Sequence, residues 1–197
     1  MIQGAIKAVI DRLVSLLLTF FLFPLMLIIG VLIKIDSRGP IFFLQRRCGL
    51  AAEEFMMYKF RTMVQGADGF KDELLSETDG PVFKLKKDPR VTRIGGFLRR
   101  WSLDELPQLL NVLRGQMSLV GPRPLENAEM RGNDHWRQMR LSVKPGITGL
   151  WQVRGRDSHR FSDWVKYDLE YVQKGSLWLD IKILLSTTVA VVRRKGT

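Results

Sequence analysis

The stretch WSLDELPQLLNVLRGQMSLVGPRP, from Trp101 to Pro124, decides how this chain of 197 residues is interpreted. Ser102 and Glu105 stand at the spacing of a capping box, in which the serine side chain caps the helix start and the glutamate reaches back to the serine amide. Leucines then follow at the i, i+3, i+4 and i+7 spacing of a buried helical stripe, at positions 106, 109, 110 and 113. We therefore predict a helix that begins at Ser102.

Two adjacent carboxylates, Asp104 and Glu105, fall in the first turn of this predicted helix. Acids at that position often serve only to stabilise the helix, and for the pair taken alone this structural role is the alternative. The same position has a chemical consequence, because the helix dipole and the guanidinium groups of Arg99 and Arg100 favour the charged form of Asp104. An ionised carboxylate can attack phosphorus when a divalent cation screens the repulsion, and both acids could share that cation.

A rigid basic turn, Gly121-Pro122-Arg123-Pro124, closes the stretch. The prolines on both sides restrict the backbone around Arg123, so its guanidinium is presented with little freedom. This presentation suits bidentate recognition of a phosphate. The tetrapeptide by itself is weak evidence, and it gains weight only from its neighbours.

An apolar segment precedes these motifs, because residues 13–33 contain no charged side chain. As a straight helix these 21 residues would cover ~31 Å, about the thickness of the hydrocarbon layer of a membrane. A cleaved signal peptide fits poorly, since the run is long and no small-residue cleavage site follows it. Pro24 removes a backbone donor near the centre. The residues alone leave two structures open, a spanning helix and a re-entrant hairpin that turns near Phe23-Pro24.

The rest of the chain predicts short elements of mixed type. We expect strands at residues 41–44 and 55–58, a loop at 64–82, an interrupted surface helix at 125–143, an ordered glycine-rich loop at 144–156, and a helix at 177–192 that packs on the core or lies in the lipid headgroup layer.

The formal net charge is +11, which indicates an anionic partner such as nucleic acid, acidic lipid or a phosphorylated substrate. The basic residues are dispersed and form no recognised motif, which argues against nucleic acid. Cys48 is the single cysteine, so no disulfide can form within the chain. His135 and His159 lack partners at zinc-ligand spacing. An enzyme at a membrane surface and a non-enzymatic basic membrane adaptor are the two classes that remain, and the adaptor gives no reason for Asp104-Glu105 beside Pro122-Arg123-Pro124.

Taken together and in order, the motifs resemble the bacterial sugar transferase family, the monotopic phosphoglycosyl transferases. The matching segments are residues 58–63, 88–92, 98–99, 102–109, 111–112, 117–124, 144–153 and 176–180. The resemblance implies a small mixed α/β (α+β) catalytic domain with surface amphipathic helices at residues 37–197. It also implies a membrane hairpin at residues 1–36, broken at Phe23-Pro24, with the catalytic domain on the cytoplasmic face of the bacterial inner membrane. The chain departs from the family pattern at Phe23, where a serine often precedes the proline.

The resemblance further implies a two-step transfer. Asp104 would attack the β-phosphorus of a UDP-sugar and release UMP, and polyprenyl (undecaprenyl) phosphate would then take the phosphosugar from the carboxylate. Glu105 would act as a ligand of Mg²⁺, together with Asp104, or as a base toward the lipid phosphate. The remaining implied site residues are Lys59, Arg61, Arg99 and Arg123 for the phosphates, and Gly149, Leu150 and Gln152 for the uridine. The implied partners are UDP-sugar, polyprenyl phosphate and anionic lipid, and a homo-oligomer stays open, as do the sugar and the glycan pathway.

Overall fold

The computed structural model describes residues 2–67, 88–130, 134–155 and 160–192. The loop predicted at residues 64–82 lies mostly outside the described residues. Within them, helices and short strands are mixed, which confirms the predicted fold class.

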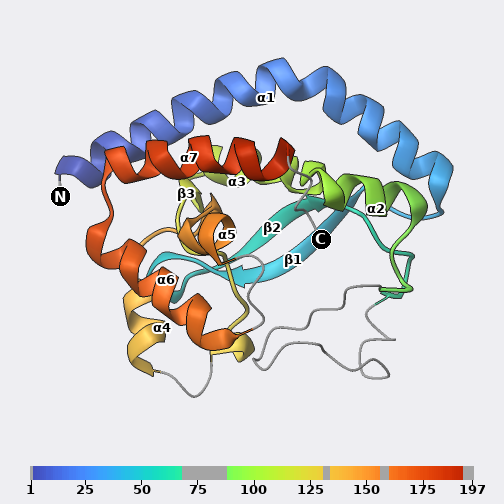
Figure 1. The fold of residues 1–197 in the computed structure, drawn as a ribbon. Coiled ribbons are helices and arrows are strands. Elements are labelled where there is room, and N and C mark those ends of the chain that lie inside the picture. Colours follow the sequence, from blue (N-terminus) through green and yellow to red (C-terminus); the bar gives the residue numbers. More distant parts are fainter. Residues whose placement is uncertain (1, 68–87, 131–133, 156–159, 193–197) are drawn as a thin grey trace.

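The first element is a long helix, α1 (Ile2–Asp36), which continues through Pro24. Figure 1 shows that α1 arches, with both ends turned toward the rest of the molecule. A proline inside a helix removes one hydrogen bond and bends the axis. The two legs predicted on either side of Phe23-Pro24 are therefore parts of one arched helix, and its re-entrant placement in a membrane stays a prediction. By length and composition α1 could cross a membrane, and only 17% of its most apolar window is buried, so it is not a core helix.

Two pairs of strands follow. Strand β1 (Phe42–Cys48) pairs antiparallel with β2 (Glu54–Phe60), which confirms both predicted strands and lengthens them. Strand β3 (Ser118–Val120) pairs in parallel with β4 (Gly146–Thr148). The prediction of a loop at 144–156 is therefore wrong, because β4 is followed directly by helix α5 (Leu150–Arg154). The glycines there permit close approach, since a Cβ on Gly146 would lie 2.0 Å from the Gly121 nitrogen.

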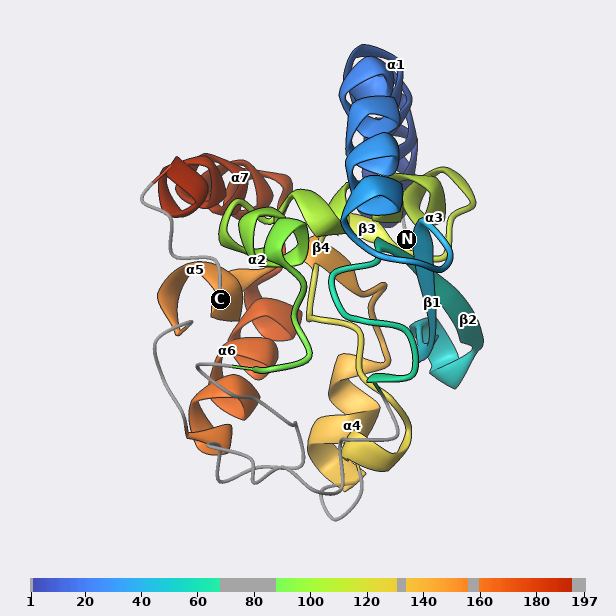
Figure 2. The ribbon, with the colours of Figure 1, turned by 90° about the vertical axis from the view of Figure 1, so that its right-hand side faces the viewer.

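The remaining helices surround these strands. They are α2 (Arg93–Arg100), the 3₁₀ helix η3 (Leu103–Gln108), α3 (Leu109–Leu113), η4 (Ala128–Met130), α4 (Asp134–Arg140), α6 (Phe161–Lys174) and α7 (Leu177–Val192), and a short 3₁₀ turn, η1 (Leu50–Ala52), joins β1 to β2. Figures 1 and 2 show α1, α2, α3 and α7 on one side of the molecule and α4 and α6 on the other, with α5 and the strands between them.

The helix at residues 177–192 is confirmed, and it packs on the core through Ile183. The surface helix predicted at 125–143 is wrong in character, because Met130 and Trp136 are each only 1% exposed. They form a core cluster with Cys48 and Leu125. Their spacing gave no helical stripe because each lies in a separate short helix, and the second of these helices buries Arg140 as well as Trp136.

Candidate active site

The acidic pair lies on η3, whose start differs from the predicted cap. Ser102 has a left-handed backbone (φ 53°) and its side chain makes no capping hydrogen bond. Its amide donates instead to the carbonyl of Arg99, at 3.0 Å, which continues the turn that ends α2. The predicted capping box is therefore wrong on the serine side. The chain forms a tight 3₁₀ turn through Pro107, and a regular α-helix begins only at Leu109.

Glu105 forms an ion pair with a lysine of the neighbouring sheet. The Nζ of Lys59, on β2, lies 3.0 Å from Oε1 of Glu105. Strand β2 is in turn tied to α3 by Asn111, which is fully buried. The Tyr58 amide donates to Asn111 Oδ1 at 3.0 Å, and Asn111 Nδ2 donates to the Met56 carbonyl at 2.8 Å. Sequence reasoning gave Asn111 no role, although a polar residue inside a leucine-rich helix was a usable signal.

Asp104 is 9% exposed. Burial raises the pKa of its carboxyl group, Lys59 opposes that rise, Glu105 adds to it, and Arg99 opposes it. This direction contradicts the prediction that its surroundings favour the charged form. The physical reason is that η3 is short and buried, so desolvation outweighs the cations.

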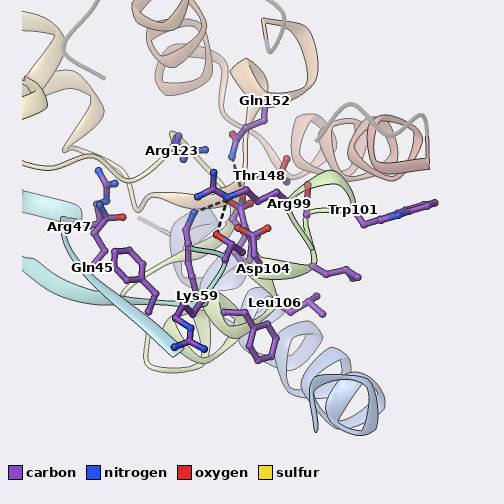
Figure 3. A pocket seen from close by; sticks show the side chains of 18 of the residues that line it. Gln45, Arg47, Lys59, Arg99, Trp101, Asp104, Leu106, Arg123, Thr148 and Gln152 are labelled. Carbon is purple, nitrogen blue, oxygen red and sulfur yellow. Dashed lines mark hydrogen bonds and ion pairs between the residues drawn. The ribbon is translucent and has the colours of Figure 1, made fainter. Parts of the chain in front are cut away.

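Three predicted phosphate ligands, Lys59, Arg99 and Arg123, line one cavity with the acidic pair, and Figure 3 shows the four labelled side chains around it. The Arg99 Nε donates to Thr62 Oγ1 at 2.9 Å, and burial lowers the pKa of Arg99 while Asp104 opposes that change. The backbone of Arg123 is fixed from outside, because its carbonyl accepts a hydrogen bond from Arg140. The structure thus brings together cations from a strand, a helix and a turn.

Arg61, the fourth predicted phosphate ligand, has other hydrogen-bond partners. Its Nη1 donates to the Arg38 carbonyl at 2.5 Å, and its Nη2 donates to the Ser37 carbonyl at 2.7 Å and more weakly to the Ile33 carbonyl at 3.4 Å. Arg61 also lines the cavity, but these bonds tie its guanidinium to the end of α1, so its role as a phosphate ligand stays a prediction. Gly39 makes room for the guanidinium, since a Cβ there would lie 2.0 Å from Arg61 Nη1.

The predicted uridine residues separate into two groups. Gly149 packs on backbone, because a Cβ there would lie 2.2 Å from the Gly121 carbonyl oxygen, and Leu150 is a core residue. Neither lines the cavity. Gln152 does line it, and its Nε2 donates to the Ile147 carbonyl at 2.9 Å. Its buried Oε1 has no hydrogen-bond partner among the residues that the structure describes, so it offers an acceptor to a ligand.

The cavity has a volume of about 790 Å³ and a further polar wall that sequence reasoning missed. Arg47, on β1, pairs with Glu129 at 2.5 Å, and Gln45 donates to Glu126 at 2.9 Å. Residues 45 and 47 alternate along a strand, so they share a face. That alternation was visible in the sequence, whereas the acids that pair with these two side chains, Glu126 and Glu129, lie about eighty positions further along the chain.

The acidic pair supplies carboxylate oxygens that a divalent cation could use as ligands. Among the described residues there is no group of three or more His, Cys, Asp and Glu side chains that could hold a metal. Mg²⁺ usually takes only one or two carboxylates, with water and substrate phosphates supplying the other oxygens. Asp104 and Glu105, beside cations suited to phosphate, fit that donor set.

The fold and the site together define a class of protein, a small α/β domain that carries a membrane-length helix and a carboxylate site lined by basic side chains. The chain belongs to the bacterial sugar transferase family, whose family model matches residues 2–194. This result confirms the resemblance found in the motifs.

Several curated proteins are similar along most of the chain. The exopolysaccharide production protein ExoY of Sinorhizobium fredii is 40% identical over 202 residues, covering 100% of this chain and 89% of the relative. The UDP-glucose:undecaprenyl-phosphate glucose-1-phosphate transferase of Xanthomonas campestris pv. campestris is 43% identical, covering 96% of this chain and 39% of the relative. The undecaprenyl-phosphate galactose phosphotransferase of Salmonella typhimurium is 41% identical, covering 97% and 41%. The chain therefore spans nearly all of one relative and about two fifths of the other two.

Proposed function

We propose that this chain is a phosphoglycosyl transferase that moves a phosphosugar from a UDP-sugar to polyprenyl phosphate. The observation that carries the proposal is the pair of buried Asp104 and half-buried Glu105 in one cavity with Lys59, Arg99 and Arg123. The Xanthomonas and Salmonella relatives support it, since both are named as transferases that act with undecaprenyl phosphate and a sugar.

In the first step a carboxylate oxygen of Asp104 attacks the β-phosphorus of the UDP-sugar. A carboxylate–phosphorus bond forms, and the bond from that phosphorus to the bridging oxygen breaks, so that UMP leaves with the electron pair. Lys59, Arg99 and Arg123 stabilise the negative charge on the phosphoryl oxygens. Mg²⁺ held by Asp104 and Glu105 would screen the repulsion between the carboxylate and the phosphate.

In the second step an oxygen of the polyprenyl phosphate attacks the same phosphorus. The bond to Asp104 breaks, the carboxylate is restored, and polyprenyl-diphospho-sugar is released. Glu105, which is ion-paired with Lys59, would either help to hold the cation or accept a proton from the incoming phosphate. Because burial raises the pKa of Asp104, the neighbouring cations are needed to keep its carboxylate ionised for the first step.

The proposed location is the cytoplasmic face of the bacterial inner membrane, with the arch of α1 as a re-entrant anchor. Both ends of α1 turn toward the rest of the molecule in Figure 1, and Arg12, Lys34 and Arg38 stand toward those ends, where anionic lipid would meet them. The outward face of α7 supports the same placement. It exposes the apolar side chains Trp178, Ile181, Leu185, Val189 and Val192.

The test uses the full chain in lipid nanodiscs with Mg²⁺, polyprenyl phosphate and a panel of UDP-sugars, and it measures UMP release. We expect Asp104→Asn to slow release by at least about a thousandfold, since a nucleophile is lost. Asp134→Asn, an exposed acid on α4, is the matched control and should keep the wild-type rate. A wild-type rate in the Asp104 variant would refute the mechanism. If no UDP-sugar yields UMP, the membrane adaptor becomes the better explanation.

A further inference from the structure

The cavity that contains Asp104 has a second part with different chemistry. There its walls come from the two helices on the outer side of the molecule, α1 and α7. The lining side chains in this part are Leu18 and Leu22 from α1, and Leu184, Thr187, Ala190 and Val191 from α7. The set contains no charged residue. The cavity therefore joins a carboxylate site to an apolar region between two helices.

The two helices are fastened together near their starts. Lys7 Nζ, on α1, lies 2.7 Å from Asp180 Oδ2, on α7, and Tyr171 donates to the other oxygen of that carboxylate at 2.8 Å. From this shared end both helices run along the same side of the molecule in Figure 1. They stand apart in Figure 2, and the apolar part of the cavity has lining residues on both of them.

The single polar side chain of this α7 wall is already satisfied. The Thr187 hydroxyl donates to the Ile183 carbonyl at 2.8 Å and meets the Thr148 hydroxyl at 2.7 Å. A phosphate or a nucleotide placed between Leu22 and Val191 would lose its hydration without gaining partners, which is costly. A hydrocarbon chain gains from the same burial. Polar substrates instead have the wall formed by Arg47, Glu126 and Glu129 in the other part of the cavity.

The surface outside this region is apolar as well. On α1, Leu17, Phe20 and Phe21 are each more than half exposed, and on α7, Trp178 and Leu185 are each 65% exposed. A helix with apolar side chains on both its inward and its outward face is expected next to lipid. The apolar region is thus flanked on both sides by surface that suits a bilayer.

We propose that the polyprenyl chain of the acceptor lipid enters between α1 and α7, so that its phosphate reaches Asp104 while its tail stays against Leu22, Ala190 and Val191. This inference rests on the proposed function and adds the route of the second substrate. UDP-sugar enters from the polar part of the cavity, so the two substrates approach the acid from different sides. The first half of the reaction then needs nothing from this passage.

The experiment separates the two halves of the reaction in nanodiscs. Without acceptor, each enzyme molecule releases UMP once, and this burst reports the first half; with acceptor, the KM for polyprenyl phosphate reports the second. Ala190→Phe fills the passage from α7, and Leu22→Trp fills it from α1. We expect both variants to keep the burst amplitude and to raise the acceptor KM by at least about tenfold. Thr188→Phe, an exposed position on α7 outside the lining, should change neither quantity.

The outcomes are distinguishable. An absent burst in the wild-type chain with every UDP-sugar overturns the proposed function itself. A normal wild-type burst, with acceptor KM unchanged in both filling variants, overturns the passage alone. Equal losses of burst and acceptor turnover in both variants also overturn it, because they indicate a general disturbance of the site. Using walls from two helices guards against one variant that fails to fold, which a thermal melt would reveal.

Discussion

Replacing Arg61 by methionine tests which of two roles this residue has. The sequence predicts a phosphate ligand, whereas the structure shows its guanidinium bonded to the Arg38 and Ser37 carbonyls at 2.5 and 2.7 Å. The carbonyls at the end of a helix have no partner within it, so an arginine that supplies donors there stabilises the end. Arg61→Met keeps the apolar stem of the side chain and removes those donors.

The expected size of the effect follows from these contacts. A hydrogen bond to a charged group contributes about 1.5–3 kcal/mol, so the two shortest bonds amount to roughly 3–6 kcal/mol. Water replaces part of this at the partly exposed Ser37, which leaves about 3 kcal/mol. For a chain of this size that corresponds to a fall in Tm of roughly 6–12 °C. If this is its main role, the KM for UDP-sugar should change less than about twofold, because both terminal guanidinium nitrogens are already bonded at the end of α1.

The assay combines a thermal melt with steady-state UMP release on the same sample. Arg100→Met, an exposed arginine on α2, is the control and should leave both Tm and KM unchanged. The reasoning would be refuted by a KM for UDP-sugar that rises about tenfold while Tm stays within about 2 °C of wild type. That result would indicate that Arg61 binds a phosphate of the substrate.

Two further predictions concern what holds the site together. Asn111→Leu leaves the Tyr58 amide and the Met56 carbonyl buried without partners, at about 1–3 kcal/mol each, so Tm should fall clearly; an unchanged Tm would show that the asparagine does not anchor β2. Hydrogen bonds from Arg90 lower the pKa of Asp88 below its ordinary 3.8. Their stabilisation is thus present above that value and is lost as the pH falls through the folded-state pKa. Asp88→Asn should therefore lower Tm at pH 7 and less so in acid, whereas an equal difference at both pH values would exclude the ionisation.

The strands and the last helix could be predicted because their signals are local. Residues 177–192 are mostly apolar, with Asp180 and Lys182 as the charged exceptions, and the short apolar runs at 41–44 and 55–58 have charged or turn residues on either side. The segment 144–156 failed for a reason that no local pattern contains. Its glycines are not there for a loose loop; Gly146 and Gly149 lie against the backbone at Gly121, which is more than twenty residues away in the sequence. Only the paired strands reveal that need.

The site residues also divide into those that the sequence predicts and those whose contacts only the fold reveals. Lys59, Arg99 and Arg123 were assigned through the resemblance, and the structure brings them into one cavity. Arg61 was assigned by the same reasoning, but the end of α1 lies beside it, and nothing near residue 61 indicates that contact. An arginine that binds a phosphate and an arginine that donates to the last carbonyls of a helix look alike in sequence, because both contacts use the same guanidinium donors. The neighbour decides between them, and that neighbour is set by the tertiary fold.

The same argument applies to Asp104. A helix cap would have made its charge a local property, fixed by Ser102 and the dipole of one helix. Instead Ser102 is left-handed, η3 is a short 3₁₀ turn, and burial raises the pKa of the acid. The groups that oppose this rise are Lys59 from β2 and Arg99 from α2, so the charge of the proposed nucleophile depends on two other elements being in place. A change that loosens β2 should then reduce UMP release more than its effect on stability alone would suggest.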